Sequence, residues 1–156
     1  MNLEPDRKIR RLLSSEQIPY NLLLLADETT EAIDGYIHES EVYVIDNEER
    51  FIAVCVLQPV DSSVVEIKNI AVDRKYQGKG IGHSLLSDAI LRAREMGYSE
   101  IIIGTGDIAT RQISLYESVG FKKYGIKKDF FIEKFPDPIF EDGVQLHDMV
   151  MLKIVL

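Results

Sequence analysis

Three glycines at alternate positions, between an apolar stretch and a long amphipathic one, constrain this chain more than any other feature: Gly78, Gly80 and Gly82. Glycine lets the backbone approach a ligand closely, and the first amides of a helix have no acceptor inside the helix. The helix dipole adds partial positive charge at that end. The sequence therefore predicts a backbone site for an anion such as a phosphate. Lys79 and Ser84 could add a charge and a hydroxyl, or could equally be solvated surface groups.

Two other phosphate-binding motifs also use glycines, and both fail here. The Walker P-loop needs Ser or Thr after Gly-Lys, whereas Gly78-Lys79 is followed by Gly80. The dinucleotide fingerprint G-x-G-x-x-G would need glycine where the chain has His83 or Leu85. A simple connecting turn would rarely need glycine at three alternate positions, so we prefer the phosphate interpretation.

Hydrophobic periodicity predicts a mixed order of helices and strands. In the first half we expect a helix over Asp6–Ser15, a buried strand over Tyr20–Ala26, a short helix after Thr29 that ends by Glu41, a hairpin of Glu41–Asp46 and Arg50–Leu57, and a strand over Val64–Val72. In the second half we expect helices over Lys79–Met96 and Thr110–Val119, a strand over Glu100–Ile103, and closing strands over Phe121–Phe131 and His147–Val155. No repeat or linker interrupts this order, so we expect one α/β domain over residues 1–156.

Composition excludes several classes of function. The chain has 18 Lys plus Arg against 26 Asp plus Glu, a net charge of −8, which argues against binding nucleic acid or an anionic membrane. It has no basic-then-apolar leader and no apolar run near the about 20 residues of a membrane span, so we expect a soluble, cytoplasmic protein. The single cysteine, Cys55, indicates a buried inert thiol, and the three scattered histidines suggest no metal site.

The glycine-rich segment also carries a family resemblance. Residues Gln77–Gly82 match every position of the signature Gln/Arg-x-x-Gly-x-Gly/Ala. Glu66–Val72 looks like the strand that precedes this signature, and Leu115–Phe121 looks like a Leu-Tyr-x-x-x-Gly-Phe segment. With these motifs in order, the chain resembles the GCN5-related N-acetyltransferase (GNAT) family. Asp129-Phe130-Phe131 and the loop Pro136-Asp137-Pro138 resemble its small bacterial single-domain members.

The resemblance implies a fold and a cofactor. The fold would be that of acyl-CoA N-acyltransferases, an α/β (α+β) arrangement with a mixed, mostly antiparallel sheet flanked by helices and splayed between the fourth and fifth strands. The cofactor would be acetyl-CoA, with its pyrophosphate on the backbone amides after the fourth strand and its pantetheine arm paired to that strand. The cofactor-binding residues would be Ile70, Ala71, Val72, Gln77, Gly78, Lys79, Gly80, Ile81, Gly82, His83 and Ser84.

Two residues are the candidate catalytic groups. An amine attacks a thioester only when it is unprotonated, so the site needs a proton acceptor, and the departing thiolate benefits from a donor. The resemblance assigns these roles to Glu66 and Tyr116, although many family members deprotonate the amine through water instead. The family's pantetheine-binding asparagine has no counterpart in the stretch Asp107–Gln112, so its replacement is unassigned.

The expected reaction is direct transfer of an acetyl group to a primary amine. The acidic balance favours a small cationic amine, and the alternatives are protein or peptide amines or a non-catalytic coenzyme A-binding module. Four acidic residues near the first short helix could attract a cation, but we interpret them as a helix start favoured by the dipole: Asp27, Glu28, Glu31 and Asp34. Members of the family often dimerise, which makes a homodimer possible.

Overall fold

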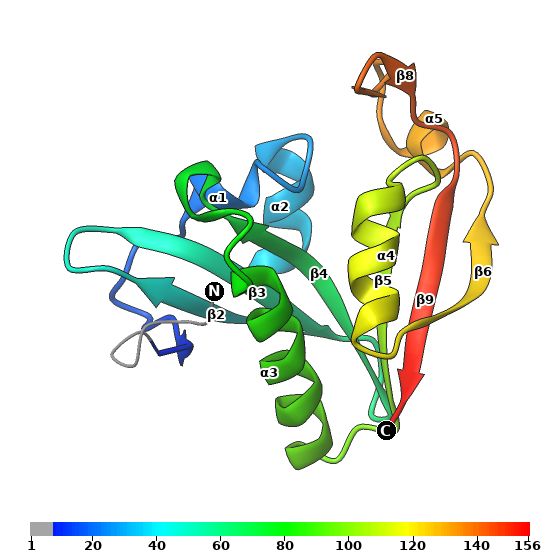
Figure 1. The fold of residues 1–156 in the computed structure, drawn as a ribbon. Coiled ribbons are helices and arrows are strands. Elements are labelled where there is room, and N and C mark those ends of the chain that lie inside the picture. Colours follow the sequence, from blue (N-terminus) through cyan, green and yellow to red (C-terminus); the bar gives the residue numbers. More distant parts are fainter. Residues whose placement is uncertain (1–7) are drawn as a thin grey trace.

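The sheet is built of seven strands, two of which separate along part of their length. In this computed structural model, which describes residues 8–156, the order is β1-β2-β3-β4-β5-β9-β6 (Figure 1). The strands are β1 (Arg10–Arg11), β2 (Glu41–Asp46), β3 (Phe51–Pro59), β4 (Val64–Val72), β5 (Glu100–Gly106), β9 (Met149–Val155) and β6 (Lys122–Lys127). All neighbours are antiparallel except β4 and β5, which are parallel because a helix returns the chain between them.

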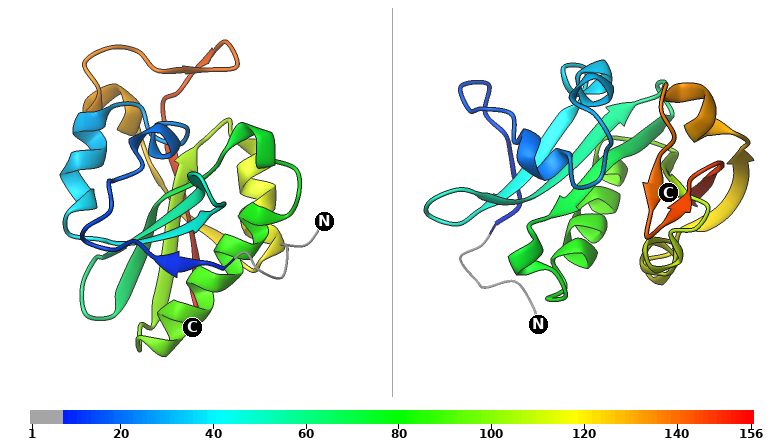
Figure 2. Two further views of the ribbon diagram at one scale, coloured as in Figure 1. Left: turned by 90° about the vertical axis from the view of Figure 1, so that its left-hand side faces the viewer. Right: turned by 90° about the horizontal axis from the view of Figure 1, so that it is seen from above.

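Helices cover both faces of the sheet (Figure 2). They are α1 (Tyr20–Leu23), α2 (Thr30–Ile37), the 3₁₀ turn η1 (Arg74–Tyr76), α3 (Ile81–Glu95), α4 (Thr110–Ser118) and α5 (Phe130–Lys134). The view from above shows α1, α2 and α5 on one side and α3 and α4 on the other. A small hairpin, β7 (Phe140–Glu141) and β8 (Val144–Gln145), follows α5. The mostly antiparallel sheet flanked by helices confirms the expected fold class.

The long helix α3 anchors the larger core. Six of its residues, spaced three or four apart or adjacent, are buried against the sheet: Ile81, Leu85, Leu86, Ala89, Ile90 and Ala93. This spacing confirms the helical face expected from the sequence. A second buried cluster lies on the other face, where α1 and α2 pack on β2, β3 and β4. The two cores therefore pack against opposite faces of β4.

The opening in the sheet begins part-way along β4. Only four residue pairs join β4 to β5, from Val64 opposite Glu100 to Ile67 opposite Ile103. On its other edge β4 bulges, because Val56 pairs with Asn69 while the next residue of β3 pairs with Ile67. The bulge bends β4 at Lys68, just where its pairing with β5 ends. This divergence, visible in Figure 1, confirms the expected splay.

Two expected elements near the N-terminus are wrong. Instead of a helix over Asp6–Ser15, the described part of this stretch forms β1, which pairs with β2 through Arg10 and Arg11; residues 6 and 7 lie outside the described residues. The Arg10 guanidinium donates to both carboxylate oxygens of Glu16, each at 2.8 Å. The long-range pairing with β2 and this local ion pair outweigh the helical propensity of a charged segment.

The expected strand Tyr20–Ala26 is also wrong, since α1 lies there. Leu22 and Leu23 are buried whereas Leu24 and Leu25 are exposed. This two-in, two-out pattern is that of a helical turn, and leucine is a good helix former. An unbroken apolar run cannot by itself distinguish a buried strand from a short buried helix.

In the second half the expected strand Phe121–Phe131 is too long. It ends at Lys127, after which Asp129 takes a left-handed conformation (φ 55°) and α5 begins. Phe131 then packs with neighbouring aromatic side chains rather than continuing the sheet. The strand after α3 runs on to Gly106 instead of ending at Ile103. The other expected elements agree with the structure to within a few residues at their ends.

Candidate active site

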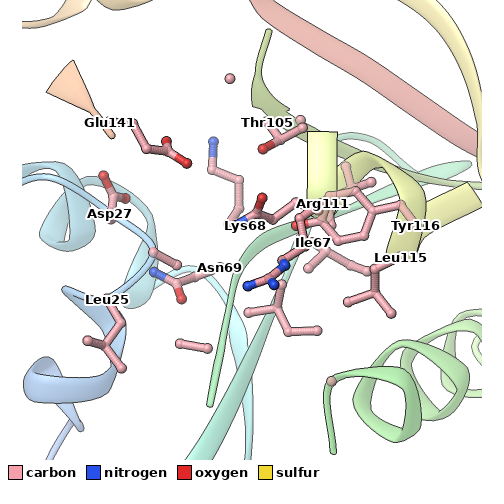
Figure 3. A pocket seen from close by; sticks show the side chains of 18 of the residues that line it. Leu25, Asp27, Ile67, Lys68, Asn69, Thr105, Arg111, Leu115, Tyr116 and Glu141 are labelled. Atoms are coloured by element: carbon pink, nitrogen blue, oxygen red, sulfur yellow. The ribbon is translucent and has the colours of Figure 1, made fainter. Parts of the chain in front are cut away.

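A cleft of about 910 Å³ lies at the splay between β4 and β5. Its walls come from the α1–α2 connection, β4, the glycine loop, β5, α4, α5 and the β7–β8 hairpin. Figure 3 shows Asn69, Lys68 and Asp27 on one side of it and Leu115 and Tyr116 of α4 on the other. Segments far apart in the sequence therefore share one concave site.

The glycine loop, which we define as residues 77–82, forms the end of the cleft next to the first turn of α3. Gly78 and Gly80 have φ values of 76° and 84°, which favour glycine, and Gly80 caps α3 without a side chain. The amide of Ser84 donates to the carbonyl of Gly80 at 3.1 Å and closes the first turn. The amides of the three residues before Ser84 precede the helical ladder and can donate to an anion.

Most of the expected cofactor-binding residues meet in this cleft. Nine of the eleven line it: Ile70, Ala71, Val72, Gln77, Gly78, Gly80, Ile81, Gly82 and His83. The side chain of Gln77 donates to the carbonyl of Val72 at 2.9 Å and so ties the loop to the end of β4. Lys79 and Ser84 are not among the lining residues, and the Lys79 ammonium lies 5.5 Å from the centre of the Tyr76 ring.

Glu66 lines the same cleft from β4. Its carboxylate is 14% exposed and lies 4.0 Å from the ammonium of Lys68, which in turn lies 5.4 Å from the centre of the Tyr36 ring. Lys68, at the bulge, thus lies between Glu66 and α2. A carboxylate held in a half-buried cleft beside an amine donor can accept a proton from an incoming ammonium or water.

Tyr116 lines the opposite wall from α4. Its side chain is buried and meets Phe121 edge to face, with ring centres 6.2 Å apart. Burial raises the pKa of Tyr116 well above its ordinary value, and the negative charge of Glu141 raises it further. The phenol therefore stays protonated and can donate a hydrogen to a developing anion.

Asn69 is a site residue that the sequence did not reveal. It is 4% exposed, and its Nδ2 donates to the carbonyl of Leu23 at 2.9 Å and to the hydroxyl of Tyr36 at 3.1 Å. The Tyr36 hydroxyl donates to Asp27 at 2.9 Å. Among residues 8–156 no donor reaches Asn69 Oδ1. Only the bulge at Lys68 turns Asn69 into this face, and no sequence signal marks that bulge.

Other cleft residues were passed over or interpreted differently. Asp27 and Glu28 line the cleft, so the helix-start interpretation holds only for Glu31, in the first turn of α2, whose cap is Thr29. Glu141, from the small hairpin, also lines it, as do residues of α4 and α5. The hairpin was expected to be a loop, and its return to the cleft could not be read from local sequence.

Three further features bear on the type of site. Cys55 is buried in β3, and burial raises the pKa of its thiol to about 12, which agrees with an inert side chain. Within residues 8–156 no group of three or more His, Cys, Asp or Glu side chains is arranged to hold a metal ion. None of the helices in that range is long and apolar enough to cross a membrane.

The comparisons with known proteins agree with this geometry. Residues 8–121 match the Acetyltransferase (GNAT) family. The chain belongs to the GNAT family. A GNAT relative from Bacillus subtilis (strain 168), the uncharacterized N-acetyltransferase YvbK, is 41% identical over 137 residues, which cover 88% of each chain.

Solved GNAT structures share the whole fold. An acetyltransferase from Elizabethkingia anophelis, solved with acetyl-CoA bound, is 41% identical and superposes with a TM-score of 0.94 over 98% of this chain and 100% of that one. A Bacillus subtilis acetyltransferase solved with CoA is 39% identical, with a TM-score of 0.85 over 96% of this chain and 99% of that one. The resemblance seen in the motifs is therefore confirmed.

Proposed function

We propose that this GNAT protein transfers the acetyl group of acetyl-CoA to the primary amine of a small cationic acceptor by direct attack. The observation that carries the proposal is the splay of β4 from β5 after Ile67, which opens directly onto the glycine loop. The two coenzyme-bound structures described above share this fold at 41% and 39% identity, which supports the same cofactor here.

The cofactor would occupy the part of the cleft between the glycine loop and the free edge of β4. Its pyrophosphate would accept hydrogen bonds from the amides of Gln77 to His83, where the helix dipole also favours negative charge. Beyond Ile67 the edge of β4 that faces β5 is unpaired, so its backbone groups can bond the amides of the pantetheine arm like an added strand. Ile70, Ala71 and Val72 lie on this free edge.

The reaction would then need two proton transfers. The neutral amine nitrogen attacks the thioester carbonyl carbon, the C–N bond forms, and the C–S bond breaks as the tetrahedral intermediate collapses. Glu66, directly or through a water, would take a proton from the nitrogen, and Tyr116 would give its proton to the thiolate of coenzyme A. These roles fit a carboxylate and a phenol on opposite walls of one cleft. The raised pKa of Tyr116 keeps its phenol protonated, so that it can donate a hydrogen bond to the developing thiolate.

The acceptor would enter between α2 and the β7–β8 hairpin. Carboxylates on this side favour a cationic amine, although protein or peptide amines use the same chemistry. A non-catalytic coenzyme A-binding module is the second candidate and would not need the Glu66 carboxylate facing the cleft. We place the reaction in the cytoplasm. We also propose that the protein forms a homodimer, which a measurement of its molecular mass in solution would test.

Thiol release tests the proposal. Purified protein is mixed with acetyl-CoA and a panel of small primary amines and short peptides with free amines, and free coenzyme A is measured together with the acetylated product. We expect amine-dependent release of coenzyme A with at least one small cationic amine. Binding of acetyl-CoA without release by any amine would instead support the binding module.

A further inference from the structure

A glycine of β5 lies just beyond the point where β4 and β5 separate (Figure 1). The last pair of the two strands is Ile67 opposite Ile103, so Gly104 is the first residue of β5 past it, and it lines the cleft. Ile67 and Ile103 both belong to the larger core. Because successive residues of a strand point to opposite faces, Gly104 faces the other side of the sheet. That is the side on which the Glu66 carboxylate lies, since Glu66 precedes Ile67.

Two methionines of β9 fill the space beside Gly104. A Cβ atom at Gly104 would lie 2.6 Å from the sulfur of Met149 and 2.8 Å from the sulfur of Met151. Met151 is buried and pairs directly with Gly104, whereas Met149 is only partly buried and lines the cleft. Methionine is unbranched and flexible, so the Met149 side chain can move into the cleft and open the space over Gly104.

The acyl group of the thioester would be directed to this same space. The pantetheine arm would run along the free edge of β4 toward Ile67, where the paired strands close the opening. With its sulfur beside Tyr116, the thioester must then turn out of the plane of the sheet. The face toward the larger core is filled by buried side chains, whereas the face with Glu66 and Gly104 borders the cleft. We call the space bounded by Gly104, Met149 and Met151 the acyl pocket.

The surroundings of the acyl pocket are apolar. Met149 packs against a small buried cluster of Phe131, Phe135 and Leu146, and all four side chains line the cleft. Each methylene group buried against such side chains gains about fourfold in affinity. A longer acyl chain can therefore repay the movement of Met149 by its own burial.

We infer that Met149 forms an adjustable end of the acyl pocket and that the protein transfers propionyl and butyryl groups as well as acetyl. This inference rests on the proposed function, because it extends the same transfer to longer thioesters. The bonds that change are the same. The amine nitrogen bonds to the acyl carbonyl carbon, the C–S bond breaks, and the proton lost by the nitrogen is balanced by the proton that the thiolate of coenzyme A gains.

The experiment compares acetyl-CoA, propionyl-CoA and butyryl-CoA with one amine that the thiol-release assay identifies as an acceptor. The value of kcat/KM is measured for each thioester with the wild type, with Met149→Ala and with Gly104→Ala. Met96→Ala is the control for the first variant, because Met96 is exposed at the end of α3 and outside the cleft lining. Gly125→Ala is the control for the second, because Gly125 also lies in a strand outside the lining, and nothing lies within 4 Å of where its Cβ would be.

We expect the wild type to use propionyl-CoA and butyryl-CoA with kcat/KM values within about tenfold of that for acetyl-CoA. Met149→Ala should raise the butyryl-to-acetyl ratio of kcat/KM by about tenfold, because the shorter side chain leaves room for the acyl chain. Gly104→Ala should lower that ratio by about tenfold, because its methyl group takes the place of the sulfur atoms and pushes Met149 into the acyl pocket.

Both control variants should keep the wild-type ratio, and thermal melting shows that each variant is folded. A wild type that prefers acetyl-CoA to propionyl-CoA by more than about 100-fold would overturn the inference while leaving the acetyl transfer established. A butyryl-to-acetyl ratio that neither Met149→Ala nor Gly104→Ala changes would overturn it as well.

A binding measurement separates this inference from the proposed function. Acetyl-CoA and butyryl-CoA are titrated calorimetrically into the wild type and the two pocket variants. If Met149→Ala strengthens butyryl-CoA binding relative to acetyl-CoA and Gly104→Ala weakens it, the acyl pocket is supported even if no amine releases thiol, a result that would contradict the proposed transfer itself. A wild type that binds acetyl-CoA but not butyryl-CoA would overturn the acyl pocket alone.

Discussion

Tyr116 gives a test at the scale of a single atom, because replacing it with Phe removes only the hydroxyl. We expect Tyr116→Phe to lower kcat by about 100-fold and to leave the acetyl-CoA affinity nearly unchanged, since the proton donor acts on the leaving thiolate. Thiol release and acetyl-CoA titration measure the two effects. Tyr98→Phe, a tyrosine packed against the larger core and outside the cleft lining, is the control. A Tyr116→Phe enzyme with full kcat would refute the donor role.

Glu66 gives a second test, with a pH dependence of its own. We expect Glu66→Gln to lower kcat/KM at neutral pH, where the acceptor amine is protonated and needs a base. The loss should shrink as the pH rises toward the pKa of the amine, because more of the acceptor is then neutral. The exposed α5 residue Glu133 supplies the control variant Glu133→Gln. A pH-independent loss, or none at all, would point to a water chain that bypasses Glu66.

Cys55 tests the burial of the sheet interior. Because burial raises the pKa of its thiol to about 12 and leaves it 2% exposed, we expect no reaction with a disulfide reagent at pH 8 in the folded protein. Reaction of one thiol per chain should follow unfolding in guanidinium. Its inertness also keeps assays of released coenzyme A free of background. Fast labelling of the native protein would contradict this placement of β3.

The sequence revealed these residues unequally. That Glu66 and Tyr116 line the cleft could be predicted, because each lies in a motif that stands out locally; their catalytic roles stay predictions. The positions of Asn69 and Glu141 in the cleft could not be predicted, because they depend on a bulge and on a distant hairpin that folds back to the cleft. Lys79 and Ser84 were expected at the cofactor, but spacing alone does not determine where a flexible side chain points.

At the scale of elements, the segment around β1 is held by one carboxylate. Glu16 accepts from the Arg10 guanidinium and from the Leu13 amide, which lowers the pKa of its carboxyl to about 2. The charged form is favoured in the folded segment, so its contribution is present above the ordinary glutamate pKa and is lost as the pH falls toward 2. We expect carboxyl NMR to show Glu16 titrating near pH 2. A titration at the ordinary glutamate pKa would contradict this pairing.

The elements that the sequence predicted well are those with long, regular periodicity. The spacing of α3 and the alternation along β4 each cover nine residues or more. The failures lie in short segments, where tertiary contacts outweigh local preference. β1 is made by pairing with β2, α1 by the burial of two leucines, and α5 by a left-handed turn at Asp129.

At the scale of the whole molecule, the two cores explain how the cleft stays open. One holds β4 against α1 and α2, and the other holds both β4 and β5 against α3 and α4. The larger core thus joins the two halves of the sheet below the point where the strands diverge, and the second core supports only the β4 side. The opening could be foreseen only through the family resemblance, because the loss of pairing after Ile67 depends on two strands far apart in the sequence.

The central claim is that the glycine loop and the splay together bind acetyl-CoA, and calorimetric titration tests it most directly. The variant is Gly82→Glu, which puts a carboxylate where the pyrophosphate would lie. Gly35→Glu is the control, because Gly35 is also helical and lies outside the cleft lining, and its exposed position leaves open space for a side chain. We expect micromolar affinity in the wild type and in Gly35→Glu, and a loss of about 100-fold or more in folded Gly82→Glu. No binding by the wild type, or equal binding by Gly82→Glu, would contradict the claim.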